Sequence, residues 1–247
     1  MRKQTDLAGV KSTARMLLMT EVHKTPYSPV VVQHPFTSTG IVALCTEGTE
    51  PMELLDITAD KNNLARWQAF MKKQIDRADH PYHIYSMVNN PYGLTFLKYT
   101  APYLSQEDFS QILASAWILC EAPHNDPDVG IRKLVSMFRD ADLATLMDEE
   151  EYAQFHELED TVTVYRGVTT HNAKNVKALS WTLNRETAEW FAHRFDEDGT
   201  VYEAQIDKKH ILALFNCRNE SEIIVDPKYL TDITEAQEQS SAFNLPQ

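Results

Sequence analysis

The spacing of apolar residues changes once along this chain, and the change limits the folds that it can adopt. In the first part, apolar side chains recur three and four positions apart, as within residues 109–120, which indicates amphipathic helices. From Thr161 onward, apolar and polar residues alternate, beginning with the run TVTVYRG, which indicates half-buried strands. Helices and strands in separate parts of a chain indicate the α+β class. We therefore expect a mainly helical N-terminal region at residues 1–157 and a β-rich region at residues 158–247.

Local signals place individual elements within each region. Asp60, Ser105 and Asn184 stand where helix N-caps are expected, each before apolar positions at helical spacing. The polar residues after Thr231 are expected to fray. A further helix is expected over residues 131–138, and strands over 30–32, 41–44, 94–99, 161–165, 177–181, 200–206, 211–215 and 222–226.

Acidic residues outnumber basic ones, and the formal net charge is −13. Such a charge repels phosphate backbones at long range, so broad non-specific binding to nucleic acid is not expected. The acids gather between Asp140 and Asp160, a stretch that we interpret as a solvated helix start and linker. Acids and bases roughly balance between Val162 and Arg218, so this segment can accept an anionic ligand.

Cysteine usage and hydropathy favour the cytoplasm. Cys45, Cys120 and Cys217 are odd in number and widely spaced, so neither a disulfide framework nor a structural zinc site is expected. No apolar run approaches the roughly 18 residues that a membrane helix needs. The apolar stretch at residues 16–19 is too short for the core of a signal peptide, and no membrane partner is expected.

Three polar clusters lie in or beside the strands expected in the second region. They are Tyr165-Arg166-Gly167, Ser180-Trp181-Thr182 and Glu220-Ser221-Glu222. An arginine, a pair of hydroxyls and two carboxylates form a set that can hold a dinucleotide and break a glycosidic bond.

The third cluster supplies the carboxylates. Glu220 and Glu222 are two positions apart in a segment that we expect to be extended, which would direct both side chains to one face. One carboxylate can then stabilise positive charge on a sugar carbon while the other takes a proton from the incoming nucleophile. The alternative is a pair of solvated glutamates at a strand edge, and for a Glu-x-Glu motif alone this alternative is the stronger.

The first two clusters supply a cation and hydroxyls. Arg166 follows Val162 and Val164 on their side of the strand, where a guanidinium needs an anionic partner, either a pyrophosphate or a neighbouring carboxylate. Gly167 lets the backbone bend or approach a ligand. Ser180 and Thr182 can hold a catalytic carboxylate or contact a ribose; alternatively, Thr182 or Asn184 caps the next helix.

In this order, the three clusters resemble the mono-ADP-ribosyltransferases of the arginine–serine–glutamate class, over about residues 161–227. The resemblance implies a split β-sandwich ADP-ribosyltransferase fold for the second region and an enzyme that transfers ADP-ribose from NAD. It also implies that Glu222 bonds the nicotinamide-ribose 2′-hydroxyl, that Glu220 activates the acceptor and that Ser180 orients the catalytic glutamate. The cofactor-binding residues that it implies are Arg166 at the NAD phosphates, with Tyr165, Gly167 and Thr182.

Two features qualify the match. Thr182 stands where many members of the family have serine, which keeps the hydroxyl. Two flexible loops of the family correspond to residues 193–199 and 216–219, where Phe215 or Arg218 would meet the target.

The resemblance implies NAD as a substrate and a macromolecular acceptor, either a protein arginine or a nucleic-acid base. It further implies a toxin or phage–host conflict context, with an antitoxin or inhibitor protein as partner. The alternatives are an NAD glycohydrolase, in which water is the acceptor, and a non-catalytic module that binds NAD. The basic residues that could form a groove for nucleic acid are Lys72, Lys73, Arg132 and Lys133.

Other catalytic motifs are absent from the sequence. It contains no Gly-x-Gly-x-x-Gly, no Walker loop, no His-Glu-x-x-His and no Gly-x-Ser-x-Gly. His80 and His83 have no cysteine nearby, so a metal site is not expected. Trp190 and Phe191 are expected to belong to the core.

Overall fold

The computed structural model describes residues 4–44, 52–120, 126, 128–170, 176–194 and 198–236, and the chain divides into two compact units, Met1–Leu146 and Met147–Gln247. Cys45, residues 195–197 of one expected loop and residues 237–247 lie outside the described residues. Among the helices that are described, none is long and apolar enough to cross a membrane.

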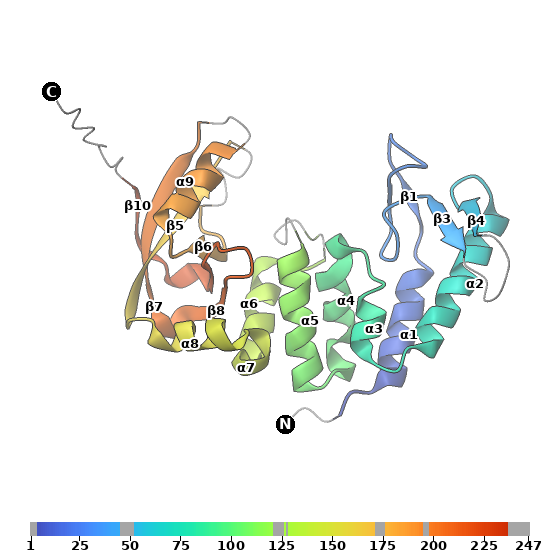
Figure 1. Ribbon diagram of the computed structural model, residues 1–247, viewed down its shortest axis with the longest axis horizontal. Helices are drawn as coiled ribbons and strands as arrows, with labels where there is room; N and C mark the ends of the chain where they lie inside the picture. The colour runs from blue at the N-terminus through green and yellow to red at the C-terminus, as the bar shows by residue number, and fades with distance from the viewer. Residues whose placement is uncertain are drawn as a thin grey trace. The chain divides into compact units, whose positions relative to one another are not determined.

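The first unit is mainly helical, as its hydrophobic spacing predicts (Figure 1). Its core contains fully buried side chains from α4 and α5, including Phe96, Leu97, Ile112 and Leu113. Two small antiparallel pairs, β1–β2 and β3–β4, accompany the helices. The elements are α1 (Leu7–Leu18), β1 (His23–Lys24), β2 (Val32–Gln33), β3 (Ile41–Leu44), β4 (Glu53–Asp56), α2 (Lys61–Arg77), α3 (Pro81–Tyr85), α4 (Gly93–Thr100), α5 (Gln106–Leu119), α6 (Ile131–Asp140) and α7 (Leu143–Leu146).

The capping residues explain where these helices begin. The Asp60 side chain accepts a hydrogen bond from Asn62 N, and that of Ser105 accepts one from Asp108 N, so both predicted N-caps are confirmed. The expected strand at residues 94–99 is wrong, because these residues form α4. Helix α4 is buried on nearly every side, so an apolar run without clear periodicity belongs here to a buried helix. Of residues 30–32, Val32 alone enters a strand, whereas Val30 and Val31 are exposed.

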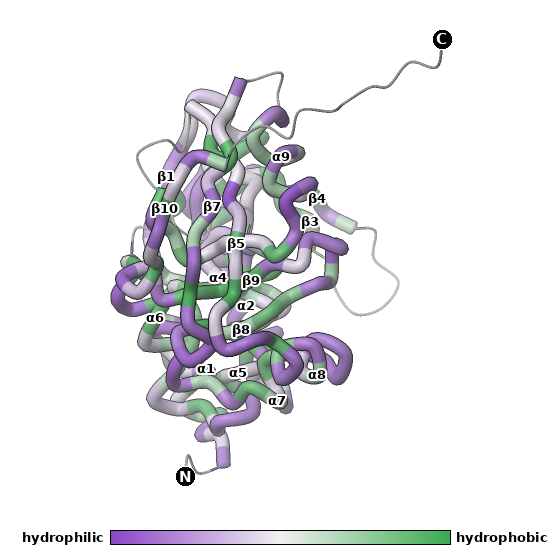
Figure 2. Tube along the Cα trace, turned by 90° about the vertical axis from the view of Figure 1, so that its left-hand side faces the viewer, coloured by the Kyte–Doolittle hydropathy of each residue, from purple (hydrophilic) through white to green (hydrophobic). Residues whose placement is uncertain are grey.

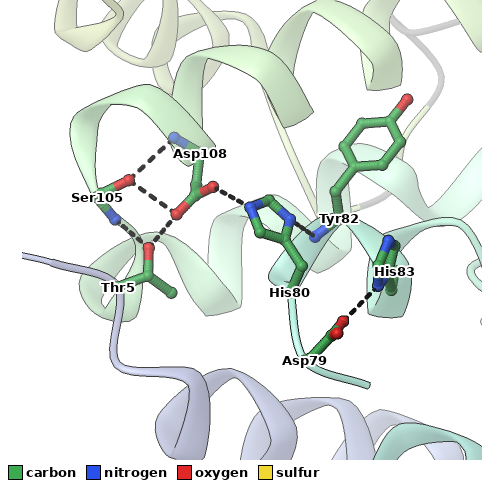
Figure 3. Close-up of polar contacts among 7 residues, drawn as sticks. All are labelled: Thr5, Asp79, His80, Tyr82, His83, Ser105 and Asp108. Atoms are coloured by element: carbon green, nitrogen blue, oxygen red, sulfur yellow. Dashed lines mark hydrogen bonds and ion pairs between the residues drawn. The ribbon is translucent and has the colours of Figure 1, made fainter.

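A polar cluster joins the starts of α3 and α5 to the N-terminal segment (Figure 3). The Asp108 carboxylate accepts hydrogen bonds from the hydroxyls of Thr5 and Ser105, and it lies 3.2 Å from His80 Nε2. His80 Nδ1 accepts a hydrogen bond from Tyr82 N, so Nε2 carries the proton and donates to Asp108. The His80 side chain is therefore used within the fold, as the N-cap of α3.

Over its described residues, the second unit is a six-stranded antiparallel sheet with the α-helices α8 and α9, which confirms the α+β class. The sheet order is β10-β7-β5-β6-β9-β8. Residues beyond Thr231, which were expected to fray, instead form β10 along β7 as far as Glu235. The elements are α8 (Glu149–Glu157), β5 (Thr161–Val168), β6 (Ser180–Thr182), α9 (Arg185–His193), β7 (Thr200–Asp207), β8 (Ile211–Phe215), β9 (Glu222–Val225) and β10 (Thr231–Glu235).

The pairing between neighbouring strands of the sheet is shortest between β5 and β6. β5 and β7 pair along their whole lengths, whereas β5 and β6 are in register where Tyr165 faces Thr182, with no other pair among the described residues. The sheet therefore consists of two three-stranded halves, β10-β7-β5 and β6-β9-β8, with a narrow junction. The first two polar clusters lie on the strands that form this junction, and the third lies at the start of β9, which pairs with β6.

The division between the units falls before α8, whereas the expected boundary fell after it. Helix α8 packs against β8, a strand made entirely of buried hydrophobic residues (Figure 2). Met147 Sδ also lies 3.3 Å from Leu214 N of that strand. The acidic stretch from Asp148 to Asp160 thus belongs to the unit that contains the sheet, whereas Asp140 and Asp142 belong to the first unit.

Candidate active site

The three clusters lie on neighbouring strands of the second unit. Tyr165 of β5 faces Thr182 of β6, and Thr182 faces Glu222 of β9, so the three residues form one row across the sheet. Residues directly opposite one another on neighbouring strands are within contact distance. Register therefore brings together segments that are far apart in the sequence. Tyr165 is partly exposed, and its other neighbour in the row is Glu203 of β7.

The serine and the second glutamate of the clusters are in direct contact. Ser180 Oγ donates a hydrogen bond of 2.5 Å to Glu222 Oε1. A hydroxyl bonded to a carboxylate at this distance is a strong, charge-assisted donor that restricts the carboxylate to one orientation. The structure thus gives Ser180 the contact that the sequence predicts for it.

Arg166 lies beside this pair and has an unused donor. Its Nη1 donates a hydrogen bond of 2.5 Å to the carbonyl oxygen of Ser180, while its Nε is buried without a hydrogen-bond partner. Burial lowers the pKa of Arg166 to about 10, and the nearby Glu222 carboxylate opposes this shift. The guanidinium is still charged at neutral pH, and its buried Nε–H has no hydrogen-bond partner among the described residues.

Gly167 allows a helix to approach the strand closely. A Cβ at this position would lie 2.2 Å from Ala188 O and 2.6 Å from Ala192 N, both in α9. These distances are shorter than any side chain tolerates, so glycine is required for α9 to pack on β5. Gly167 is therefore needed for the packing of α9, and its approach to a cofactor stays a prediction.

Thr182 has a structural role, and its contact with a ribose stays a prediction. It is buried, and its hydroxyl donates to Glu220 O at 2.6 Å and accepts from Asn184 N at 3.0 Å. Asn184 in turn caps α9, accepting hydrogen bonds from Glu186 N and Thr187 N. The Thr182 hydroxyl thus joins the turn before β9 to the start of α9.

The two glutamates do not lie in one extended segment. Strand β9 begins at Glu222, and Ser221 has a φ of 45°, in the left-handed region. Strand alternation therefore does not set the direction of Glu220 relative to Glu222. The expectation of one extended segment that contains both glutamates is wrong. Turn contacts determine the direction of Glu220 instead.

Two residues near the clusters differ from their sequence-based interpretation. Trp190 was expected in the core but is 62% exposed, because Ala188 and Ala192 form the buried face of α9. Glu151 was expected to be solvated, but it is 6% exposed and completes a capping box with Asp148. The Asp-x-x-Glu spacing was the available signal for this box.

Other candidate sites have less support. A surface depression of about 400 Å³ lies in the first unit near the end of α2, and none of the three clusters lines it. Among the described residues, no group of three or more His, Cys, Asp or Glu side chains could hold a metal ion.

Comparisons with known proteins give no match to any family model, curated protein or solved structure.

Proposed function

We propose that this chain is an NAD-dependent mono-ADP-ribosyltransferase and that its second unit is a split β-sandwich of the arginine–serine–glutamate class. The observation that carries the proposal is the 2.5 Å hydrogen bond from Ser180 Oγ to Glu222 Oε1, beside the buried guanidinium of Arg166. The narrow junction between the two halves of the sheet also supports it, because a sheet that parts there can admit a ligand.

The residues suit the chemistry of this reaction. Arg166 would bind the pyrophosphate of NAD, since its unpaired Nε and its positive charge both favour an anion. Glu222, oriented by Ser180, would accept a hydrogen bond from the 2′-hydroxyl of the nicotinamide ribose. Its negative charge would stabilise the positive charge that develops on the sugar carbon as nicotinamide leaves.

Glu220 would act on the acceptor. A carboxylate near the sugar carbon can take the proton from an incoming nucleophile, which by the resemblance is a protein arginine or a nucleic-acid base. With water as the nucleophile, the same site would be an NAD glycohydrolase. The proposed setting is a toxin or phage–host conflict effector in the cytoplasm, with an antitoxin or inhibitor protein as an additional partner.

The proposal is tested by nicotinamide release from NAD by the purified chain and by transfer of labelled ADP-ribose in a cell lysate. We expect Glu222→Gln to lower both rates by about 10³-fold, because an electrostatic group at the reacting centre contributes effects of this size. Glu220→Ala should abolish transfer and leave hydrolysis. Treating the labelled lysate with protease or nuclease then identifies the class of acceptor.

Glu203→Gln is the matched control, because Glu203 lies in the same row of the sheet but has no part in the proposed chemistry. It should change both rates by less than about twofold. Calorimetry that shows NAD binding by a wild-type chain that releases no nicotinamide would support a binding module and reject the enzyme.

A further inference from the structure

The residue between the two glutamates has a backbone conformation that must be held in place. Ser221 has a φ of 45°, and Asn219, two positions earlier, has a φ of 56°. Residues other than glycine rarely adopt this left-handed region of φ. They do so where surrounding contacts hold the backbone. The contacts of Ser221 therefore determine where Glu220 lies.

Contacts from two directions hold Ser221. Its N–H donates a hydrogen bond of 3.0 Å to Asn216 Oδ1, and its carbonyl oxygen accepts one of 3.1 Å from Leu183 N. The preceding carbonyl oxygen, that of Glu220, accepts from the Thr182 hydroxyl. The residues just after β6 thus hold one side of the segment, and the Asn216 side chain holds the other.

Asn216 is itself held by a buried carboxylate. Its N–H donates a hydrogen bond of 2.6 Å to Glu151 Oε1, and the other oxygen of Glu151 accepts from Asp148 N at 3.0 Å. The Asn216 carbonyl oxygen accepts from Asn219 N at 2.9 Å, which closes the turn. A chain of hydrogen bonds therefore runs from the start of α8 through Asn216 to the backbone between the two glutamates.

The two glutamates have separate supports. Ser180 holds the Glu222 carboxylate directly, whereas the backbone contacts of Ser221 and Thr182 set the position of Glu220. Given the proposed function, we infer that Glu151 and Asn216 are positioning residues that hold Glu220 in place for transfer to the acceptor. Loss of Asn216 Oδ1 should therefore impair transfer more than NAD cleavage.

The test compares Asn216→Ala, which removes the acceptor oxygen, with Asn216→Asp, which keeps it. Asn216→Ala should lower transfer of labelled ADP-ribose to lysate acceptors at least tenfold, while nicotinamide release in buffer changes less than threefold. Hydrogen exchange of the Ser221 amide should become at least tenfold faster, because its acceptor is lost. Asn216→Asp should restore both transfer and protection.

Thr163→Ala is the control for a merely structural loss. It removes the hydrogen bond that Gln205 Nε2 donates to Thr163 Oγ1 at 2.9 Å, in the same sheet, and should leave the ratio of transfer to hydrolysis unchanged. Equal loss of both activities in Asn216→Ala, or no loss of either, would overturn the inference while the proposed function stands. A wild-type chain that releases no nicotinamide would overturn both.

Discussion

Each unit of this protein contains a serine hydroxyl that donates to a carboxylate, and the surroundings of the two contacts differ. In the first unit, Ser105 Oγ lies 2.8 Å from Asp108 Oδ2, and the same carboxylate also accepts hydrogen bonds from Thr5 and His80 (Figure 3). In the second unit, Ser180 Oγ lies 2.5 Å from Glu222 Oε1, beside Arg166 with its unpaired Nε.

The comparison separates a structural pair from a candidate catalytic one. The Asp108 carboxylate joins the starts of α3 and α5 to the N-terminal segment, because its donors are Thr5, His80 and Ser105. The pair in the second unit leaves a buried cationic donor unused, which costs folding free energy unless an anion binds. Both sites pair a hydroxyl with a carboxylate. The unpaired Nε of Arg166 distinguishes the site in the second unit.

The largest expected effect is a loss of stability of the first unit in acid. His34 of the first unit is fully buried, its Nε2 has no hydrogen-bond partner, and burial lowers its pKa to about 4 from the ordinary 6.5. As the pH falls, the unfolded chain therefore binds a proton before the folded unit does. Through His34 alone, the free energy of unfolding of the first unit should fall by about 3 kcal/mol between pH 6.5 and pH 4, and this contribution should stay constant at lower pH. Urea unfolding at several pH values, followed by hydrogen exchange in each unit, measures this loss.

His34→Phe is the control for this prediction, since it fills the site without titrating. Its first unit should lose about 3 kcal/mol less than the wild type over the same pH range. A wild-type first unit that is equally stable at pH 7 and pH 4 would contradict the assigned cause.

Replacing each serine by alanine tests whether the two hydroxyl–carboxylate contacts have different roles. Ser180→Ala should lower nicotinamide release by about 100-fold, because losing a side chain that orients a catalytic group has effects of up to this size. Ser105→Ala should instead cost about 1 kcal/mol of stability in the first unit through loss of an N-cap, with activity unchanged. Kinetics and thermal melting of the two variants, measured side by side, check both expectations. If the two alanines had the same effect on turnover, the distinction between the sites would fail.

The smallest expected effect is that of replacing Arg166. Arg166→Lys keeps the charge but removes the planar arrangement of donors, including Nε. NAD affinity should fall at least tenfold, equivalent to about 1.4 kcal/mol, as measured by calorimetry. Lys208→Arg provides a control substitution of a cation in the same unit, and it should leave the affinity unchanged. An unaltered affinity in Arg166→Lys would locate the anion contact elsewhere.

Local signals predicted those parts of the fold that depend on periodicity and capping. The helices after Asp60 and Ser105, most strands of the second unit and the cap at Asn184 follow from side-chain spacing and short-range hydrogen bonds. Two of the failures occur where burial exceeds what the local pattern indicates. Residues 94–99 form a helix that is buried on nearly every side, and Glu151 is a buried acid within a charged stretch.

The sequence alone determined which chemical groups this protein carries, their order and the two secondary-structure regimes, because these depend on residue identity and on periods of a few residues. Tertiary structure alone decided which of the groups meet. Sheet register brings Ser180 to Glu222, packing of α9 occupies the space beside Gly167, and a left-handed Ser221 sets the direction of Glu220. Register, close packing and turn geometry depend on contacts between residues far apart in the chain, which no local pattern records.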